Sequence, residues 1–381
     1  MKILFCSNYF THHQKPLAME LDVLTNHHFS FLGYKEMDAE RMHLGWGNES
    51  IPDFVYNSHS MSSKENITDT DVLIVGSFPE SQLRELWKNV KLVFRYQERP
   101  LKNGDSIIKY PIRFLRWHYN NPHYKNIYML CASAFTAGDY RKYGLFRNRC
   151  YKWGYFPETR RYENIEDLFS KKSGMTLLWC GRFIDWKRPQ SVIEVARQLK
   201  LEKMPFVLQM IGAGPEEKNL KQMVDRWELQ DCVEFLGAMS PEKVRDKMEC
   251  ADIFLFTSDR KEGWGAVLNE AMNSGCAVIA AHEIGSAPYL IKNNENGLIY
   301  SSGETSDLFE KTRYLLRFPK EQKRLGFAAY HTIADLWNAE VAAKRLTILS
   351  TAILNGNTFP DLFSEGPCSR ADIIHKEWYK K

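Results

Sequence analysis

The chain has 381 residues, of which 44% are hydrophobic and 26% are charged, and its formal net charge is +4. This length and ordinary composition suit two globular domains, each with its own core. They also exclude a membrane-spanning class, because no apolar run approaches the ~18 residues that cross a bilayer.

The eight cysteines include no Cys-x-x-Cys pair. This pattern argues against a zinc site and a disulfide framework, and it is typical of reduced thiols in the cytoplasm. The apolar run at the start is too short for a signal peptide. We therefore expect a cytoplasmic protein without a bound metal. Peripheral association with the inner face of the cell membrane is compatible with this expectation.

The first half of the chain alternates short apolar runs with helical segments. The predicted strands are 2–7, 29–33, 71–76, 91–96 and 127–131, and the predicted helices are 17–24 and 80–88. This alternation predicts a doubly wound parallel sheet, and we assign residues 1–165 to a first Rossmann-like domain. The loop at 8–16 lacks Gly-x-Gly-x-x-Gly, which argues against a dinucleotide cofactor at the first turn.

Basic and aromatic residues are concentrated in the second part of this domain. The basic ones are Arg84, Lys88, Lys91, Arg95, Arg99, Lys102, Lys109, Arg113, Arg116, Lys125, Arg141, Lys142, Arg147, Arg149 and Lys152. Such a patch suits an anionic membrane surface or a phosphorylated acceptor, and the alternative is a solvated basic face over buried aromatic residues. No common nucleic-acid-binding motif is present, so we expect no nucleic-acid partner.

A segment rich in Gly, Pro and charged residues, 153–172, interrupts the alternation and is predicted to connect two domains. The second half then repeats the pattern. Its predicted strands are 175–180, 206–211, 233–236, 253–256, 277–281 and 297–300, and its predicted helices include 189–199, 241–250, 306–317, 319–330, 338–354 and a short one near 371–379. We assign a second Rossmann-like domain to 174–337.

Residues 254–275 carry the clearest functional signal. They predict a buried strand, a glycine-rich turn after Glu262, and a helix that starts at Ala266 and carries Glu270. Glycines let a ligand approach the backbone, and the first turn of a helix attracts phosphate. Two carboxylates beside such a helix start suit a ligand with both phosphate and sugar hydroxyls. In isolation, a residue such as Glu270 is more often a solvated helix residue.

Two basic residues follow another predicted strand of the same domain. Arg182 comes directly after the strand at 175–180, and Lys187 follows five residues later. A departing diphosphate gains negative charge as its bond to a sugar breaks, so Arg and Lys stabilise it. Alone, the two side chains could be surface charges, but their position at the end of a parallel strand favours a ligand site.

An ordered series of motifs runs through the second domain. In sequence order, these are Gly181-Arg182 with Lys187, Gly212-x-Gly214-Pro215, Phe235-x-Gly237, Ala251-Asp252, Glu262-Gly-x-Gly-x-x-x-x-Glu270, Gly275-x-x-Val278-Ile279-Ala280, Gly285 and Asn296-Gly297. Over about residues 175–300 the sequence resembles the retaining family-four glycosyltransferases of the GT-B fold. The tail resembles bacterial members that build surface polysaccharides.

This resemblance implies two Rossmann-like domains that face each other across a cleft, with a final helical segment at about 338–381 that packs back onto the first domain. It implies that the reacting centre is formed by Arg182, Lys187 and Glu262. The residues that it implies for donor binding are Gly263, Trp264, Gly265, Ala266, Glu270, Gly212 and Leu236. Within these sets, Arg182 and Lys187 would bind the diphosphate, Glu270 the ribose, and Glu262 the hydroxyls of the donor sugar.

The chain departs from the family pattern in its first domain. Members usually have a glycine-rich loop after the first strand and a histidine after the strand that corresponds to 91–96. We interpret the residues that stand at these places as acceptor-side residues, and they are His12, His13, Glu98 and Arg99. Solvent-facing loop histidines are the alternative for the first two.

These observations predict a metal-independent, retaining hexosyltransferase without a cofactor. Its expected partners are a nucleoside-diphosphate sugar, a glycan or lipid-diphosphate-linked acceptor, and an anionic membrane surface. The alternatives are a non-catalytic GT-B-like subunit and a sugar-nucleotide epimerase or hydrolase of the same fold.

Overall fold

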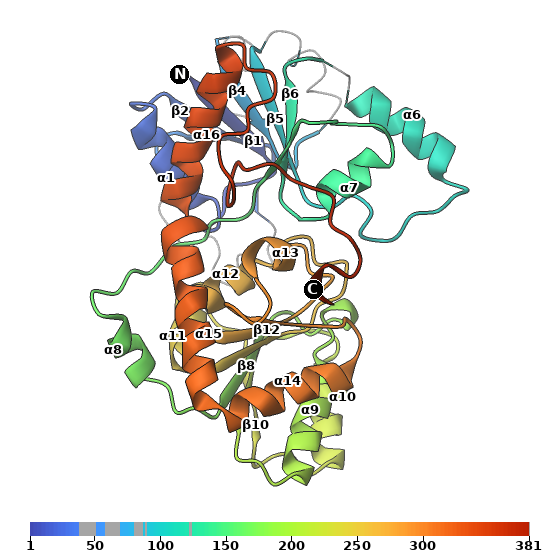
Figure 1. Ribbon diagram of the computed structural model, residues 1–381, viewed down its shortest axis with the longest axis vertical. Coiled ribbons are helices and arrows are strands. Elements are labelled where there is room, and N and C mark those ends of the chain that lie inside the picture. Colours follow the sequence, from blue (N-terminus) through green and yellow to red (C-terminus); the bar gives the residue numbers. More distant parts are fainter. Residues whose placement is uncertain (38–50, 58–68, 80–86, 88–89, 122–123, 381) are drawn as a thin grey trace. The chain divides into compact units, whose positions relative to one another are not determined.

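The computed structural model describes residues 1–37, 51–57, 69–79, 87, 90–121 and 124–380. The chain forms two compact units (Figure 1). Unit 1 contains residues 1–158 and 337–376, and unit 2 contains residues 159–336 and 377–381. The predicted helix at 80–88 lies outside the described residues except for Trp87.

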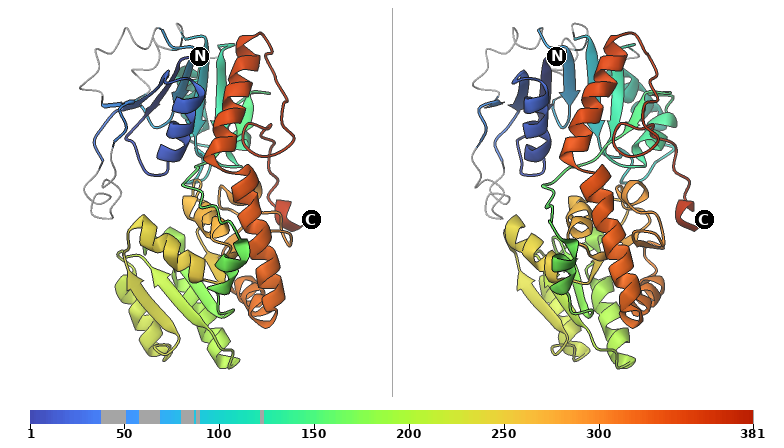
Figure 2. Two further views of the ribbon diagram at one scale, coloured as in Figure 1. Left: turned by 90° about the vertical axis from the view of Figure 1, so that its left-hand side faces the viewer. Right: turned by 60° about the vertical axis from the view of Figure 1, so that its left-hand side comes forward.

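Unit 1 is built on a seven-stranded parallel sheet with the order β3-β2-β1-β4-β5-β6-β7. The strands are β1 Ile3–Ser7, β2 Phe29–Gly33, β3 Val55–Asn57, β4 Val72–Val75, β5 Leu92–Gln97, β6 Ile127–Cys131 and β7 Cys150–Lys152. The helices α1 (Lys15–Leu24) and α16 (Ala339–Leu354) pack against each other, as both views of Figure 2 show. The last long helix therefore belongs to unit 1 although it comes late in the sequence.

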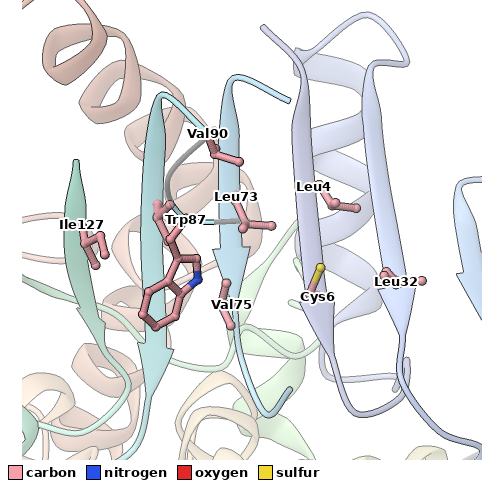
Figure 3. Close-up of a cluster of buried hydrophobic side chains, with 9 residues drawn as sticks. Leu4, Cys6, Leu32, Leu73, Val75, Trp87, Val90 and Ile127 are labelled. Atoms are coloured by element: carbon pink, nitrogen blue, oxygen red, sulfur yellow. The ribbon is translucent and has the colours of Figure 1, made fainter. Parts of the chain in front are cut away.

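The core of unit 1 follows from the apolar strands. Alternate residues of β1 and β4, such as Leu4 and Cys6 or Leu73 and Val75, point to one face, where they meet Trp87 (Figure 3). Because every residue of β1 and β4 is buried, the strands are covered on both faces. This arrangement is typical of parallel sheets and explains why these strands are apolar throughout.

Several elements of unit 1 are absent from the sequence-based prediction. They are the strands β3 and β7 and the helices α6 (Tyr110–Asn120) and α7 (Thr136–Arg141). The helix α6 consists largely of aromatic and branched residues with weak helix propensity. Its position depends on tertiary packing, since Trp117 lies 5.0 Å from the ring of Tyr140 and 4.5 Å from that of Tyr143.

Unit 2 contains a six-stranded parallel sheet with the order β10-β9-β8-β11-β12-β13. The strands are β8 Thr176–Cys180, β9 Val207–Ile211, β10 Val233–Gly237, β11 Ile253–Phe256, β12 Ala277–Ala281 and β13 Leu298–Tyr300. The helices are α8 Ile165–Ser170, α9 Gln190–Leu201, α10 Glu217–Arg226, α11 Pro241–Cys250, α12 Ala266–Asn273, α13 Ala287–Leu290, α14 Thr305–Arg317 and α15 Pro319–His331. All six strands predicted from the sequence of this half are present.

The segment that begins at residue 159 belongs to unit 2 through Arg160. Its backbone N–H donates to Asn273 Oδ1 at 2.8 Å, and its guanidinium contacts Glu249 at 2.7 Å and Asp246 at 2.9 Å. Burial opposes the ionisation of Glu249, but hydrogen bonds from Lys171, Tyr162 and Arg160 outweigh it and lower the pKa of this carboxyl to about 2. The first unit consequently ends at 158 rather than at the expected 165.

The predicted helix near 371–379 is wrong. The tail instead pairs with the edge strand β7, where Lys152 N–H donates to Ser369 O at 2.8 Å and Cys368 N–H donates back to Lys152 O at 2.8 Å. Only a short 3-10 turn, Trp378–Lys380, follows, and the Trp378 indole donates to His282 O in unit 2 at 3.2 Å. The edge pairing ends at Ala371, whose N–H donates to Cys150 O at 3.0 Å, so the first residue of the predicted helix belongs to this pairing instead.

Candidate functional site

The topology of unit 2 places a ligand site at the ends of β8 and β11. These neighbouring strands lie where the strand order reverses, because the chain proceeds from β8 toward β10 on one side and from β11 toward β13 on the other. Ligands of open parallel sheets bind at the carboxyl ends of the strands beside such a switch point. The two predicted motifs, Gly181 to Lys187 and Glu262 to Glu270, begin at or just after these two strand ends.

The loops after β8 and β9 are held together by their backbones. Gly181 N–H donates to Ile211 O at 3.0 Å, and Phe183 N–H donates to Ala213 O at 2.9 Å. Gly212 has φ of +141°, and a Cβ atom on it would lie 1.9 Å from the carbonyl oxygen of Gly181. The structure thus gives Gly212 a packing role, in which it fixes the loop that carries Arg182.

Gly212→Ala is expected to destabilise unit 2 by more than about 2 kcal/mol, because the new methyl group meets a backbone atom that cannot move aside. Thermal unfolding of the purified chain measures this loss. The matched control is Gly174→Ala, where φ is +85° and no heavy atom lies within 4 Å of the new Cβ. That control should cost only about 1 kcal/mol of backbone strain. Equal losses in the two variants would contradict the packing role.

The structure brings Lys187 and Glu262 together. The Lys187 ammonium lies 2.7 Å from Glu262 Oε2, and the two side chains are only 13% and 11% exposed. The Ser258 hydroxyl donates to the same carboxylate oxygen at 2.8 Å. Since an ammonium has three donors and one is given to Glu262, the pair leaves hydrogen-bonding capacity for an anionic ligand.

The backbone around this pair is fixed by a buried hydrogen-bond chain. The Trp179 indole donates to Thr257 Oγ1 at 2.9 Å, and the Thr257 hydroxyl donates to Lys187 O at 2.7 Å. Thr257 and Ser258 were not predicted as site residues. The signal for them was their position, since two hydroxyl residues directly follow the buried strand β11.

The helix α12 begins at the same end of the sheet. Its N-cap residue, Gly265, has φ of +85°, and a Cβ there would lie 2.4 Å from the ring of Phe256. Trp264 is fully buried, and its indole donates to Asn269 Oδ1 at 2.9 Å. Its side chain therefore belongs to the core, and only its backbone is left to contact a nucleotide-sugar donor. The first N–H groups of the helix, at Ala266 and Val267, lack intrahelical acceptors and favour an anion.

Glu270 lies further along α12. Burial raises the pKa of its carboxyl to about 7, although the positive charges of Arg245 and Arg160 act in the opposite direction. Its charge in turn contributes to the raised pKa of Cys180, after burial of that thiol. Glu270 therefore lies near the last residue of β8. Glu270 is half-buried, so its carboxyl is less solvated than that of an ordinary helix-surface glutamate.

Two other predicted donor-side residues, Arg182 and Leu236, lie at or near the ends of β8 and β10. Arg182 is exposed, and the described residues offer its side chain no ion pair. Leu236 is half-buried near the end of β10, next to Phe235, whose ring lies 6.1 Å from that of Phe183. The role of each in donor binding stays a prediction.

In unit 1 the four predicted acceptor-side residues separate into two environments. Glu98 accepts a hydrogen bond from the Tyr155 hydroxyl at 2.8 Å, and the ring of His13 lies 6.5 Å from that of Tyr155 and 3.9 Å from that of His12. Arg99 instead points to Asp139 at 3.5 Å, with its guanidinium 4.6 Å above the ring of Phe135. The Arg99 side chain is 10% exposed, and its acceptor-side role stays a prediction. Tyr155 was not predicted as a site residue because it lies in the segment interpreted as a linker.

Comparison with known proteins decides the family of unit 2. Residues 161–332 match the family described as glycosyl transferases group 1. These residues form a group 1 glycosyltransferase domain. The resemblance inferred from the ordered motifs is confirmed for this part of the chain.

Two curated relatives agree with this assignment. The amylovoran biosynthesis glycosyltransferase AmsK of Erwinia amylovora is 31% identical over 177 residues, which are 45% of this chain and 43% of that protein. The N-acetyl-alpha-D-glucosaminyl L-malate synthase of Bacillus anthracis is 27% identical over 169 residues, 44% of this chain and 43% of that protein. The chain thus matches less than half the length of either relative.

Solved structures extend the likeness to both units. Anabaena HepE, solved with UDP and glucose, superposes with a TM-score of 0.66 at 15% identity and covers 92% of this chain and 100% of its own. Sucrose-phosphate synthase of Thermosynechococcus elongatus gives 0.64 at 14% identity and covers 93% and 100%. The fold of the chain is therefore GT-B, with two parallel-sheet Rossmann-like units. No helix in the described part of the chain is long and apolar enough to cross a membrane.

Proposed function

We propose that the protein transfers a hexose from a nucleoside-diphosphate sugar to a hydroxyl group of a glycan or of a lipid-diphosphate-linked acceptor, with retention of configuration. The observation that carries this proposal is the buried pair of Lys187 and Glu262 next to the start of α12, at the switch point of a group 1 glycosyltransferase domain. Its pathway is the synthesis of a surface polysaccharide, since AmsK is named for amylovoran biosynthesis.

In the proposed reaction, the bond between the anomeric carbon and the β-phosphate oxygen breaks while the acceptor oxygen bonds to the same face of that carbon. The proton of the acceptor hydroxyl passes to the departing phosphate oxygen. Arg182, Lys187 and the N–H groups at the start of α12 stabilise the growing negative charge. With these groups in place, the reaction needs neither a metal ion nor a strong side-chain base.

The two glutamates orient the donor in this proposal. Glu262 accepts hydrogen bonds from hydroxyls of the sugar while it holds Lys187, and Glu270 accepts hydrogen bonds from the ribose. The first donors to test are UDP-sugars, because the Anabaena structure of the same fold contains UDP. The acceptor side falls to unit 1, where His12, His13, Glu98 and Tyr155 lie near one another.

A thermal-shift screen with UDP-, GDP-, dTDP- and ADP-sugars tests the donor site. A ligand that binds only the folded chain at about 100-fold excess over its Kd should add roughly 2.7 kcal/mol of stability. Glu270→Ala should abolish this gain, while the surface variant Glu321→Ala should keep it. If no nucleotide sugar stabilises the chain, the non-catalytic subunit becomes the better reading. Free sugar or an isomerised donor released without acceptor would instead favour the hydrolase or epimerase.

A further inference from the structure

The helix α6 of unit 1 carries a row of large apolar side chains that the fold leaves in solvent. Ile112 and Leu115 are 73% and 70% exposed, and Tyr119, one turn further, is 58% exposed. Their spacing of three and four residues places all three on one side of the helix. The turn before the helix adds Ile107 and Ile108, which are 93% and 89% exposed. Together these five residues form the apolar stripe.

The opposite side of α6 packs on unit 1 through aromatic rings. Trp117 packs on Tyr140 and Tyr143, and Tyr110 stacks on Tyr143 at 4.7 Å between ring centroids. Figure 1 shows the helix at the outer side of unit 1, beyond β6. The helix is thus held by one aromatic face, and the apolar stripe points away from the core to which it is attached.

The charges around the stripe are positive. The helix contains no acidic residue, and the exposed cations beside it are Lys102, Lys109, Arg116, Arg141 and Lys142. The nearby acids are paired with cations. Asp105 is exposed, but it is bound by Arg113 and by the Tyr143 hydroxyl and lies 4.0 Å from Lys142, while the buried Asp139 is bound by Arg99. At helical spacing, Lys109 and Arg116 flank the stripe on one side, where long basic side chains can reach anionic groups while the apolar residues insert.

We propose that α6 and its preceding turn dock unit 1 onto an anionic lipid bilayer, with the apolar stripe inserted into the boundary between headgroups and acyl chains. The combination of exposed branched and aromatic side chains with flanking cations is the chemistry of a helix that lies in the membrane interface. A second protein copy is a weaker occupant, because two copies that met through this face would bring their like charges together.

The biological reason for docking rests on the proposed function, since a lipid-linked acceptor is presented at a membrane surface. The lipid-binding activity itself depends only on α6. The acceptor-side residues and the docking helix belong to the same unit, so docking would bring the acceptor domain to the membrane.

Co-sedimentation of the full chain with vesicles tests the proposal. The wild-type chain should bind vesicles of phosphatidylcholine with phosphatidylglycerol, and binding to phosphatidylcholine alone should be much weaker. The variant Ile112→Ser/Leu115→Ser should lower the partition coefficient at least about tenfold, because it removes apolar area that inserts. The variant Lys109→Glu/Arg116→Glu should remove the preference for anionic vesicles, and added salt should have the same effect on the wild type.

The matched control is Leu201→Ser/Phe318→Ser, which removes two similarly exposed apolar residues, 73% and 51% exposed, from unit 2. It should bind vesicles as the wild type does. Circular dichroism should show that all variants stay folded, since every substituted side chain is exposed. Absence of wild-type binding to anionic vesicles, or unchanged binding of the Ile112/Leu115 variant, would overturn the proposal. If the Ile112/Leu115 variant differs from the wild type in oligomeric mass but binds vesicles equally well, the apolar stripe would be assigned to contact with a second copy of the chain.

The donor assay separates the two proposals. The Ile112/Leu115 variant should keep the stabilisation by a nucleotide sugar, and Glu270→Ala should keep vesicle binding. Loss of vesicle binding alone would leave the transferase proposal intact, and loss of donor binding alone would leave the docking surface intact.

Discussion

Lys187→Ala is expected to lower kcat/KM for sugar transfer roughly a hundredfold, which corresponds to the loss of about 3 kcal/mol of transition-state stabilisation. The ammonium is half of a buried ion pair with Glu262, so it is held at one point with little freedom. Stabilisation of a leaving diphosphate requires such a preorganised charge, because no reorganisation is then needed as the bond breaks. Initial-rate kinetics with saturating donor should show the loss in kcat, and donor affinity should change much less.

The chief alternative is that Lys187 only neutralises Glu262. The double variant Lys187→Ala/Glu262→Gln distinguishes the two, because the neutral amide leaves no unpaired buried charge. It should be much less active than Glu262→Gln alone if the ammonium acts on the diphosphate. Equal activity of the double variant and of Glu262→Gln alone would assign Lys187 a structural role. The control Lys323→Ala removes a lysine of the same unit from a surface pair with Glu166 and should leave kcat unchanged.

Most strands of the two units could be predicted because they are short, largely apolar runs, whereas β3 and β7, with three residues each, were missed. β11 and β12, for instance, contain no exposed residue, so their sequence records their burial directly. The order of the strands in the sheet differs from their order in the sequence. The switch point between β8 and β11 explains why residues far apart in sequence share one site. Lys187 and Glu262 are 75 residues apart, yet both follow strands that are neighbours.

Other features depended on contacts that a single sequence does not display. Trp264 stands inside the glycine-rich turn and was predicted to contribute to donor binding, and the sequence does not reveal that its indole is buried and donates to Asn269. Arg99 was interpreted as an acceptor-side residue beside Glu98, but successive residues of an extended segment point to opposite sides, and Arg99 meets Asp139. The helix α6 escaped prediction because its stability comes from aromatic packing rather than from helix propensity.

Glu270 gives the second large expected effect, which is a pH dependence of donor binding. Burial raises the pKa of its carboxyl to about 7, and protonation turns one of the two oxygens that would accept from the ribose hydroxyls into an O–H donor. Below that pH, donor affinity should therefore fall about tenfold for each pH unit. Calorimetric titration with the preferred nucleotide sugar on both sides of pH 7 measures the effect. Glu270→Gln should bind weakly at every pH and show only the titration of the ligand's own phosphates.

The same carboxyl has the opposite effect on folding. Its pKa is raised above the usual value of 4.5, so its favourable contribution to folding is complete below about pH 4.5 and is lost as the pH rises to about 7. A shift from 4.5 to about 7 corresponds to about 3 kcal/mol of differential stability at most, so Glu270→Gln should unfold at a higher temperature than the wild type above pH 7. A variant that is more stable and yet binds donor less tightly is the signature of a charge buried for function. If Glu270→Gln were instead less stable above pH 7 and bound donor normally, the carboxylate would be a structural partner of Arg245 and Arg160 and the ribose would be held elsewhere.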